Sequence, residues 1–176
     1  MNYLAHLHLG GDQPAQLLGS LYGDFVKGQL RGQWPADIEA AIRLHRRIDV
    51  FTDSHPLVAQ AKARFPQARR RYAGIIIDIF FDHCLARDWA SYAAEPLAQF
   101  SGRVYRVLQA EQQLPERLAL IVPRMAAQDW LASYADFAVL ELVLQGMQRR
   151  LSRAGVLDGA IAELDSLYEP LLRDFR

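Results

Sequence analysis

A predicted helix over residues 35–53 carries an imidazole and a carboxylate on its apolar face. His45 and Asp49 are four residues apart, and a helix turns by about 100° per residue, so the two side chains lie on the same side. A further acid, Asp53, lies at the edge of this face. A histidine and an acid stacked within an apolar stripe can form a hydrogen bond or bind a cation. The stripe itself consists of Ile38, Ile42, Ile48 and Thr52.

A second predicted helix, over residues 74–92, places acids in an even more apolar setting. Asp78 and Asp82 are again four residues apart, and His83 follows directly. The segment is apolar nearly all round, which predicts a helix buried in the centre of a bundle, although its run of isoleucines also allows a buried strand. An ionised carboxylate that is buried without a partner costs several kcal/mol, so it shifts its pKa, pairs or binds a cation.

Further candidate ligands come from the N-terminal part of the chain. Asp24 borders the apolar stripe of a predicted helix over residues 14–27, and the stretch before it carries His6 and His8. Imidazole and carboxylate ligands without a thiolate suit manganese, iron, zinc or magnesium. A bundle can supply such ligands from facing helices. A bound divalent ion would offset the burial of the acids and lower the pKa of a water molecule.

Two interpretations without a metal ion remain open. The first is that His45 and Asp49 form an ordinary hydrogen bond within one helix or between helices. The second is that Asp78 and Asp82 belong to a buried ion-pair network with nearby arginines. The arginines available for that network are Arg69, Arg70 and Arg71.

The elements that must position these side chains are predicted to be helices. Apolar residues recur with a helical period along the chain, and no repeat or low-complexity segment divides it. Only residues 3–9 alternate, over a stretch too short to distinguish strand from helix. Pro66 is expected to kink or split one helix, and Pro123 to break another. The sequence therefore predicts an all-α, single-domain bundle of seven or eight helices over residues 1–176. The helices are expected over residues 14–27, 35–53, 57–71, 74–92, 96–112, 116–132, 137–153 and 157–173.

The composition is that of an ordinary globular protein. The chain has 176 residues, of which 51% are apolar, and its 20 basic and 20 acidic residues cancel. Without net positive charge, binding of nucleic acid is not expected. Cys84 is the single cysteine, so no internal disulfide can form, which fits a reducing compartment. No stretch reaches the roughly 18 apolar residues of a membrane span. We therefore expect a soluble, cytoplasmic protein without a membrane partner.

Four groups of residues in the first half of the chain form a combination that is more specific than any one of them. They are Asn2-Tyr3-Leu4-Ala5-His6-Leu7-His8-Leu9, Gly23-Asp24-Phe25-Val26, His45-Arg46-Arg47-Ile48-Asp49 with Thr52-Asp53, and Asp82-His83 followed by Leu85 and Trp89. Together they resemble the acyl carrier protein phosphodiesterases, a family also called acyl carrier protein hydrolases. The resemblance covers essentially the full length and is densest over residues 2–89.

This resemblance implies an enzyme that hydrolyses the phosphodiester between 4′-phosphopantetheine and a serine of holo-acyl carrier protein, giving the apo carrier. It also implies an all-helical, HD-phosphohydrolase-like fold and a divalent ion, with Mn²⁺ favoured and Mg²⁺ or Fe²⁺ as alternatives. The typical HD site has a histidine, an adjacent His–Asp dyad and a later aspartate. This chain contains no His–Asp dipeptide, but it has Asp82 and His83 in reversed order and His45 one turn before Asp49.

The resemblance and the helix positions together give a site assignment. The expected metal ligands are Asp24, His45, Asp82, His83 and His6, with Asp49 as a further candidate. A carboxylate can orient the attacking water as general base, and a guanidinium can stabilise charge on the phosphoryl oxygens. The residues expected to act in catalysis are Asp24, Asp49, Asp78 and Arg46.

A basic segment over residues 62–71 is a candidate docking surface. Acyl carrier proteins are small and strongly acidic, and this segment contains no acid. Its charges would steer an acidic partner, although they can equally be solvated surface charges. The basic residues are Lys62, Arg64, Arg69, Arg70 and Arg71. Two other functions stay open: an HD-like phosphohydrolase acting on nucleotides or other small phosphoesters, and a non-catalytic helical module that binds acyl carrier protein.

Overall fold

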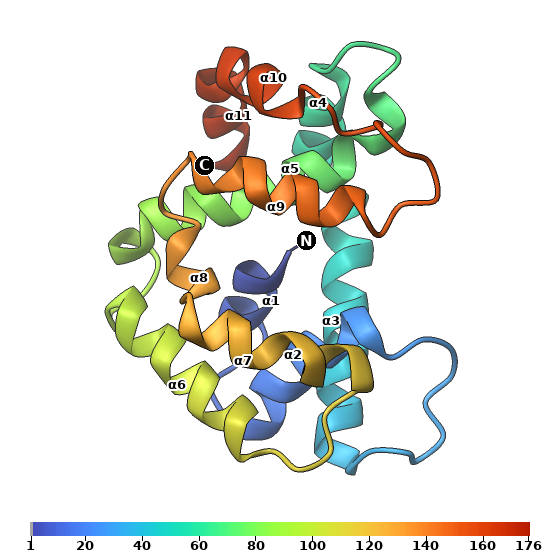
Figure 1. The fold of residues 1–176 in the computed structure, drawn as a ribbon, viewed down its shortest axis with the longest axis vertical. Helices are drawn as coiled ribbons and strands as arrows, with labels where there is room; N and C mark the ends of the chain where they lie inside the picture. Colours follow the sequence, from blue (N-terminus) through green and yellow to red (C-terminus); the bar gives the residue numbers. More distant parts are fainter. Residues whose placement is uncertain (1) are drawn as a thin grey trace.

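The computed structural model describes residues 2–176, and this part of the chain is helical without a strand. The predicted all-α fold is therefore confirmed. Figure 1 shows α1 near the middle of the molecule, with the other helices around it. Within the described chain, no helix combines the length and apolar character needed to cross a bilayer. In chain order the helices are α1 (Tyr3–Leu9), α2 (Pro14–Phe25), α3 (Ala36–Asp53), α4 (Pro56–Ala63), α5 (Arg70–Arg87), the 3₁₀ helix η1 (Trp89–Ser91), α6 (Leu97–Ala110), α7 (Glu116–Ala127), α8 (Trp130–Ser133), α9 (Val139–Gln148), α10 (Ala160–Ser166) and α11 (Tyr168–Phe175).

Both segments whose pattern also allowed a strand are helices. The alternating N-terminal stretch forms α1, and the isoleucine-rich segment forms α5. As predicted for a helix that is apolar nearly all round, α5 lies in the centre and packs against α1, α4, α8, α9, α10 and α11. Its buried apolar side chains join one continuous core with those of the surrounding helices. Those of α5 are Ala73, Ile76, Ile77, Ile79, Phe80, Cys84, Leu85 and Ala86.

Prolines divide the helices less simply than the sequence predicts. The predicted split at Pro66 is confirmed, because α4 ends at Ala63 and α5 begins at Arg70. The predicted break at Pro123 is wrong, since this residue lies inside α7. Proline removes one hydrogen bond, to the carbonyl of Ala119, and both residues are exposed, so water can satisfy that carbonyl. The chain leaves the helical path instead at Asp129, whose φ is +42°.

The described chain therefore contains more helices than the seven or eight predicted. Segment 116–132 divides into α7 and α8, and segment 157–173 divides into α10 and α11. The N-terminal helix α1 adds one more. Helical period locates helical segments well, but it does not register a single turn or a change of direction between two short helices.

Two glycines allow α2 to lie unusually close to α3. A Cβ atom at Gly19 would lie 2.3 Å from the Cβ of Ala41 and 2.8 Å from the carbonyl oxygen of Ile38. One turn later, a Cβ atom at Gly23 would lie 2.2 Å from two ring carbons of His45. Side chains at these positions would push the helices apart. The close crossing therefore places the imidazole of His45 directly against the backbone of α2.

Candidate metal centre

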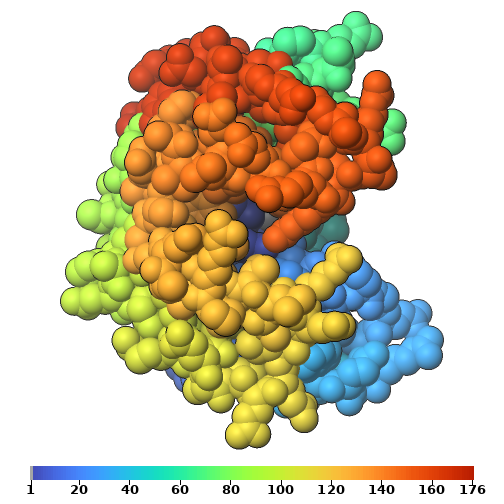
Figure 2. Space-filling view, viewed as in Figure 1, coloured from blue at the N-terminus to red at the C-terminus, as the bar shows by residue number. Residues whose placement is uncertain are grey.

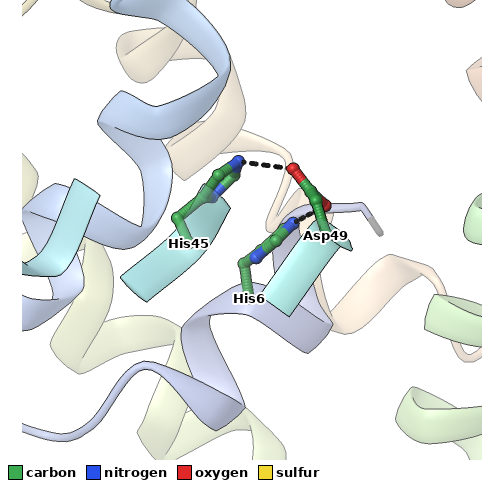
Figure 3. Close-up of side chains that lie close together, drawn as sticks. All are labelled: His6, His45 and Asp49. Atoms are coloured by element: carbon green, nitrogen blue, oxygen red, sulfur yellow. Dashed lines mark hydrogen bonds and ion pairs between the residues drawn. The ribbon is translucent and has the colours of Figure 1, made fainter. Parts of the chain in front are cut away.

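His6, His45 and Asp49 converge where α1 meets α3, and Figure 3 shows both imidazoles directed at the carboxylate. Nε2 of His6 lies 3.0 Å from Oδ1 of Asp49, and Nε2 of His45 lies 3.3 Å from Oδ2. The two rings stack with their centroids 3.6 Å apart. One potential ligand atom from each residue lies within 4.8 Å of the other two. The structure thus brings together three of the residues singled out in the sequence.

The position and the tautomer of His45 are fixed by α2. Its ring packs on Gly23, and its Nδ1 lies 2.7 Å from the carbonyl oxygen of Ser20. A carbonyl only accepts, so Nδ1 carries a proton and donates it to Ser20. Nε2 then faces the carboxylates of Asp49 at 3.3 Å and Asp24 at 4.0 Å, which also only accept. This nitrogen therefore requires either a second proton or a cation in front of it.

His6 is positioned by α1, and α1 is anchored by Asp82. The two carboxylate oxygens of Asp82 accept hydrogen bonds from the backbone N–H groups of Leu4, at 2.8 Å, and Ala5, at 2.9 Å. A carboxylate at a helix N-terminus is favourable because the first N–H groups of a helix have no partner within it. Asp82 is fully buried, and burial raises its pKa to about 7. Asp82 therefore acts here on the helix that carries His6.

The two carboxylates of the cluster differ in their electrostatics. Partial burial disfavours the charge of Asp49, but hydrogen bonds from His45 and His6 hold its pKa well below the usual value. Burial raises the pKa of Asp24, and the neighbouring His45 and His6 only partly oppose this. Both side chains are 37% exposed, whereas the histidines are almost fully buried. The acids therefore form the side of the cluster that a ligand can reach.

The structure does not bring His83 into this cluster. Its Nδ1 donates to the carbonyl oxygen of Tyr134 at 2.8 Å, and its Nε2 lies 2.8 Å from the hydroxyl of Tyr168. Both ring nitrogens are thereby satisfied within the protein. His83 is not part of the ligand-forming group found among the described residues, so its expected role as a metal ligand has no support in this geometry.

Two of the residues expected to act in catalysis, Arg46 and Asp78, are not part of the ligand-forming group found among the described residues. Arg46 donates to the carbonyl oxygens of Val26 and Gly28, each at 2.9 Å, and so holds the segment that follows α2. Asp78 is half-buried on α5, one turn before Asp82. Burial raises its pKa, and the nearby charges of Asp53 and Asp49 add to this effect. Because both terminal nitrogens of Arg46 donate to backbone carbonyls, its guanidinium is not directed at a phosphate.

Much of the basic segment 62–71 is paired within the molecule. Arg64 binds Asp174, with Nη2 at 2.8 Å from Oδ1, and Arg69 binds Glu163, with Nε at 3.0 Å from Oε2. Lys62 pairs with Asp53 at 2.8 Å. The two others donate to backbone carbonyls or lie over a ring, namely Arg70 to Phe65 and Ala63, and Arg71 above Tyr72. The segment therefore presents less free charge than its sequence suggests.

The residues of the cluster fit a divalent cation. Two imidazoles and a carboxylate are typical first-row metal ligands, and a second carboxylate, Asp24, lies beside them. The Nδ1 atom of His6 is buried without a hydrogen-bond partner among the described residues. The cluster thus has more polar capacity than the protein satisfies by itself. The hydrogen bond from His45 to Ser20 is the kind of outer contact that fixes a metal-binding tautomer.

The fold and the cluster define an all-helical protein with a candidate metal centre near its N-terminus. The full sequence, residues 1–176, matches the family model described as "Acyl carrier protein phosphodiesterase". The chain belongs to this family.

Curated relatives carry the same description. One from Photorhabdus laumondii is 41% identical over 172 residues, which cover 96% of this chain and 86% of the relative. One from Serratia proteamaculans is 37% identical over 182 residues, covering 99% and 92%. One from Escherichia coli O6:H1 is 36% identical over 173 residues, covering 97% and 90%. No solved structure matches the chain.

The residues that hold His45 in place are not among those predicted from the sequence to form the site. Ser20 supplies the carbonyl for Nδ1, and Gly23 supplies the flat surface on which the ring packs. A signal for the second exists in the sequence, because Gly19 and Gly23 are four residues apart on one helix. Small residues at this spacing allow two helices to approach closely. The carbonyl of Ser20 leaves no such signal, since every residue has one.

Proposed function

We propose that this protein hydrolyses the phosphodiester linking 4′-phosphopantetheine to the serine of holo-acyl carrier protein and releases the apo carrier. The cluster of His6, His45 and Asp49 is the observation that carries the proposal, because it gives a member of this family a fitting centre for phosphoester hydrolysis. The names of the curated relatives support the substrate. The single buried thiol of Cys84 agrees with a cytoplasmic site of action.

The proposed cofactor is a divalent cation, with Mn²⁺ as the first candidate. His6, His45 and Asp49 would hold it, and Oδ1 of Asp24 lies just outside this group, 4.0 Å from Nε2 of His45. Two imidazoles favour Mn²⁺ or Fe²⁺ over Mg²⁺, which prefers oxygen ligands. When bound, such a cation supplies Lewis acidity to a phosphoryl oxygen and to a water molecule.

The two acids are suited to different tasks. Asp49 keeps its charge because the histidines hold its pKa low, so it serves as a permanent anionic ligand. Asp24 lies outside the three-residue ligand group and its side chain is 37% exposed, so it can exchange protons with water or with a leaving alkoxide. We therefore assign general acid–base work to Asp24 before Asp49 or Asp78. From the buried side, His45 faces both acids and His6 contacts Asp49.

The docking of the acidic carrier remains a proposal of its own. Within segment 62–71, Arg70 and Arg71 form no ion pair with an acid among the described residues. They are the remaining candidates of the five, because the charges of Lys62, Arg64 and Arg69 are met by acids of this chain. Contacts to exposed charges of this kind act on the association rate and weaken with salt.

Incubation of the purified protein with holo-acyl carrier protein and Mn²⁺ tests the function directly. We expect mass spectrometry to show the carrier losing the mass of the phosphopantetheine arm, and a chelator to prevent this. His45→Ala is the matched inactive control. Binding without any mass change would instead identify a non-catalytic carrier-binding module. Turnover of nucleotides or of bis-p-nitrophenyl phosphate, with the carrier left intact, would identify a hydrolase of small phosphoesters.

A further inference from the structure

A guanidinium from the far end of the chain reaches the helix that carries His6. Arg150 follows α9, and its Nη1 donates to the hydroxyl of Tyr3 at 3.2 Å. Tyr3 lies one turn before His6 on α1, is 6% exposed and packs on the ring of Phe25 at 6.3 Å between centroids. Figure 2 shows a hollow in this face of the molecule, with N-terminal atoms at its floor and the orange segment that contains Arg150 at its rim.

Among the described residues, Arg150 forms no ion pair with an acid. The hydrogen-bond partner of its guanidinium is the neutral hydroxyl of Tyr3. Burial disfavours its charge, yet the neighbouring Tyr3 and Asp24 raise the pKa of Arg150 above its usual value. The ring of Tyr3, whose hydroxyl the guanidinium contacts, packs on Phe25, the residue next to Asp24, so Arg150 approaches the side of the cluster that Asp24 borders. One hydrogen bond leaves most of the five N–H donors of this guanidinium available.

We infer that Arg150 and the hydroxyl of Tyr3 form an anion subsite beside the His6–His45–Asp49 cluster, which binds a non-bridging oxygen of the phosphodiester. The inference deepens the proposed function and rests on it. A guanidinium matches phosphate oxygens through two parallel hydrogen bonds, and such charge-assisted bonds are among the strongest that proteins form. The hydroxyl of Tyr3 accepts a hydrogen bond from the guanidinium and so holds it in place.

The comparison with Arg46 supports this assignment. Arg46 belongs to the His45–Asp49 motif on α3 that resembles the family, but its two terminal nitrogens donate to the carbonyl oxygens of Gly28 and Val26. The guanidinium of Arg150 has no such backbone partner among the described residues, and it contacts Tyr3, which packs on Phe25 next to Asp24. Of the two guanidinium groups, Arg150 is the one with donors left for a substrate.

Kinetics of Arg150→Ala, Arg150→Lys and Tyr3→Phe test the subsite, with Arg149→Ala as the matched control. Arg149 lies next to Arg150, and its Nε donates to the backbone of α9. We expect Arg150→Ala to lower kcat/KM on holo-acyl carrier protein by about 10- to 100-fold, the loss typical of a hydrogen bond to a charged group. Tyr3→Phe and Arg150→Lys should lose less. Added guanidinium ion should restore part of the activity of Arg150→Ala, which a purely structural defect would not allow.

A binding measurement separates the subsite from the proposed function. Inorganic phosphate is titrated into chelator-treated protein and followed by phosphorus NMR, and circular dichroism confirms that the variants are folded. We expect Arg150→Ala to weaken phosphate binding by about tenfold and Arg149→Ala to leave it unchanged. If wild-type protein binds phosphate through Arg150 but does not act on the carrier, the proposed function is wrong and the anion site stands. If Arg150→Ala keeps wild-type phosphate affinity, or loses activity without rescue by guanidinium, the subsite is wrong.

Discussion

The buried histidines of the described chain lie at two sites, His6 with His45 and His83 alone, and the hydrogen-bond partners at these sites differ in kind. His83 has one acceptor and one donor beside its ring, the carbonyl of Tyr134 and the hydroxyl of Tyr168. Arg87 in turn donates to that hydroxyl and pairs with Asp88 at 2.7 Å. A neutral imidazole satisfies this environment completely, since one ring nitrogen donates and the other accepts.

His45 meets only acceptors. Its Nδ1 faces a backbone carbonyl and its Nε2 faces the carboxylates of Asp49 and Asp24. A neutral ring would direct a lone pair at negative charge, so this environment requires an imidazolium or a cation. The difference between the two sites teaches that burial alone does not mark a histidine as a candidate metal ligand. The chemical nature of both partners of the ring does.

The largest expected effect comes from removing a ligand of the His6–His45–Asp49 cluster. We expect Asp49→Asn and His45→Ala to lower kcat on holo-acyl carrier protein by at least about 10²- to 10³-fold, as for loss of a group that acts on the reacting phosphate. At 100 times its Kd, added Mn²⁺ should increase the free energy of unfolding of the wild-type protein by about 2.7 kcal/mol and raise its Tm. That rise should vanish in His45→Ala and persist in His83→Gln. A fully active Asp49→Asn protein would contradict the metal centre.

Substitution of His83 should give the opposite result. His83→Ala removes a buried ring and leaves the carbonyl of Tyr134 without its donor, so we expect a loss of about 2–4 kcal/mol in the free energy of unfolding. The activity per folded molecule should stay within about twofold of wild type, because no step is assigned to this residue. Denaturant unfolding and kcat measured together check both points. Since the alanine variant can fail to fold, His83→Gln serves as the milder test. Loss of the Mn²⁺ response in folded His83→Gln would return His83 to the ligand set.

Gly23→Ala tests whether the close approach of α2 to α3 positions His45. The added methyl group would lie 2.2 Å from the imidazole ring, so the ring must move. We expect kcat to fall by about 10- to 100-fold, since small displacements at a catalytic centre have effects of this size. Gly146→Ala is the control, because a Cβ there has nothing within 4 Å. Equal kcat values for both alanine variants would show that packing on Gly23 does not position His45.

The sequence predicts the helices and the composition of the candidate site better than the partners of each side chain. Helical period is a local property, so the central helix α5 and the pairing of His45 with Asp49 are visible without a structure. Asp82 lies on the expected helix, but its role depends on which helix N-terminus meets it, and Leu4 is 78 residues away. Arg64 likewise finds Asp174 110 residues further along the chain. Such long-range pairs decide whether a charge is free, and no spacing rule encodes them.

The smallest expected effect concerns Asp88, which pairs with Arg87 beside the Tyr168 hydroxyl that contacts His83. A hydrogen bond from Arg87 holds the pKa of Asp88 below its usual value. A lowered pKa in the folded state stabilises the protein above the unfolded pKa of about 3.9, and this contribution is lost as the pH falls through the folded value. We therefore expect Asp88→Asn to lower stability at pH 7 by about 0.5–1 kcal/mol and to have less effect at the acid end. Thermal unfolding of wild type and variant across pH 3–7 measures the difference. A pH-independent difference would show that Asp88 stabilises the protein through packing or neutral hydrogen bonds and not through its charge.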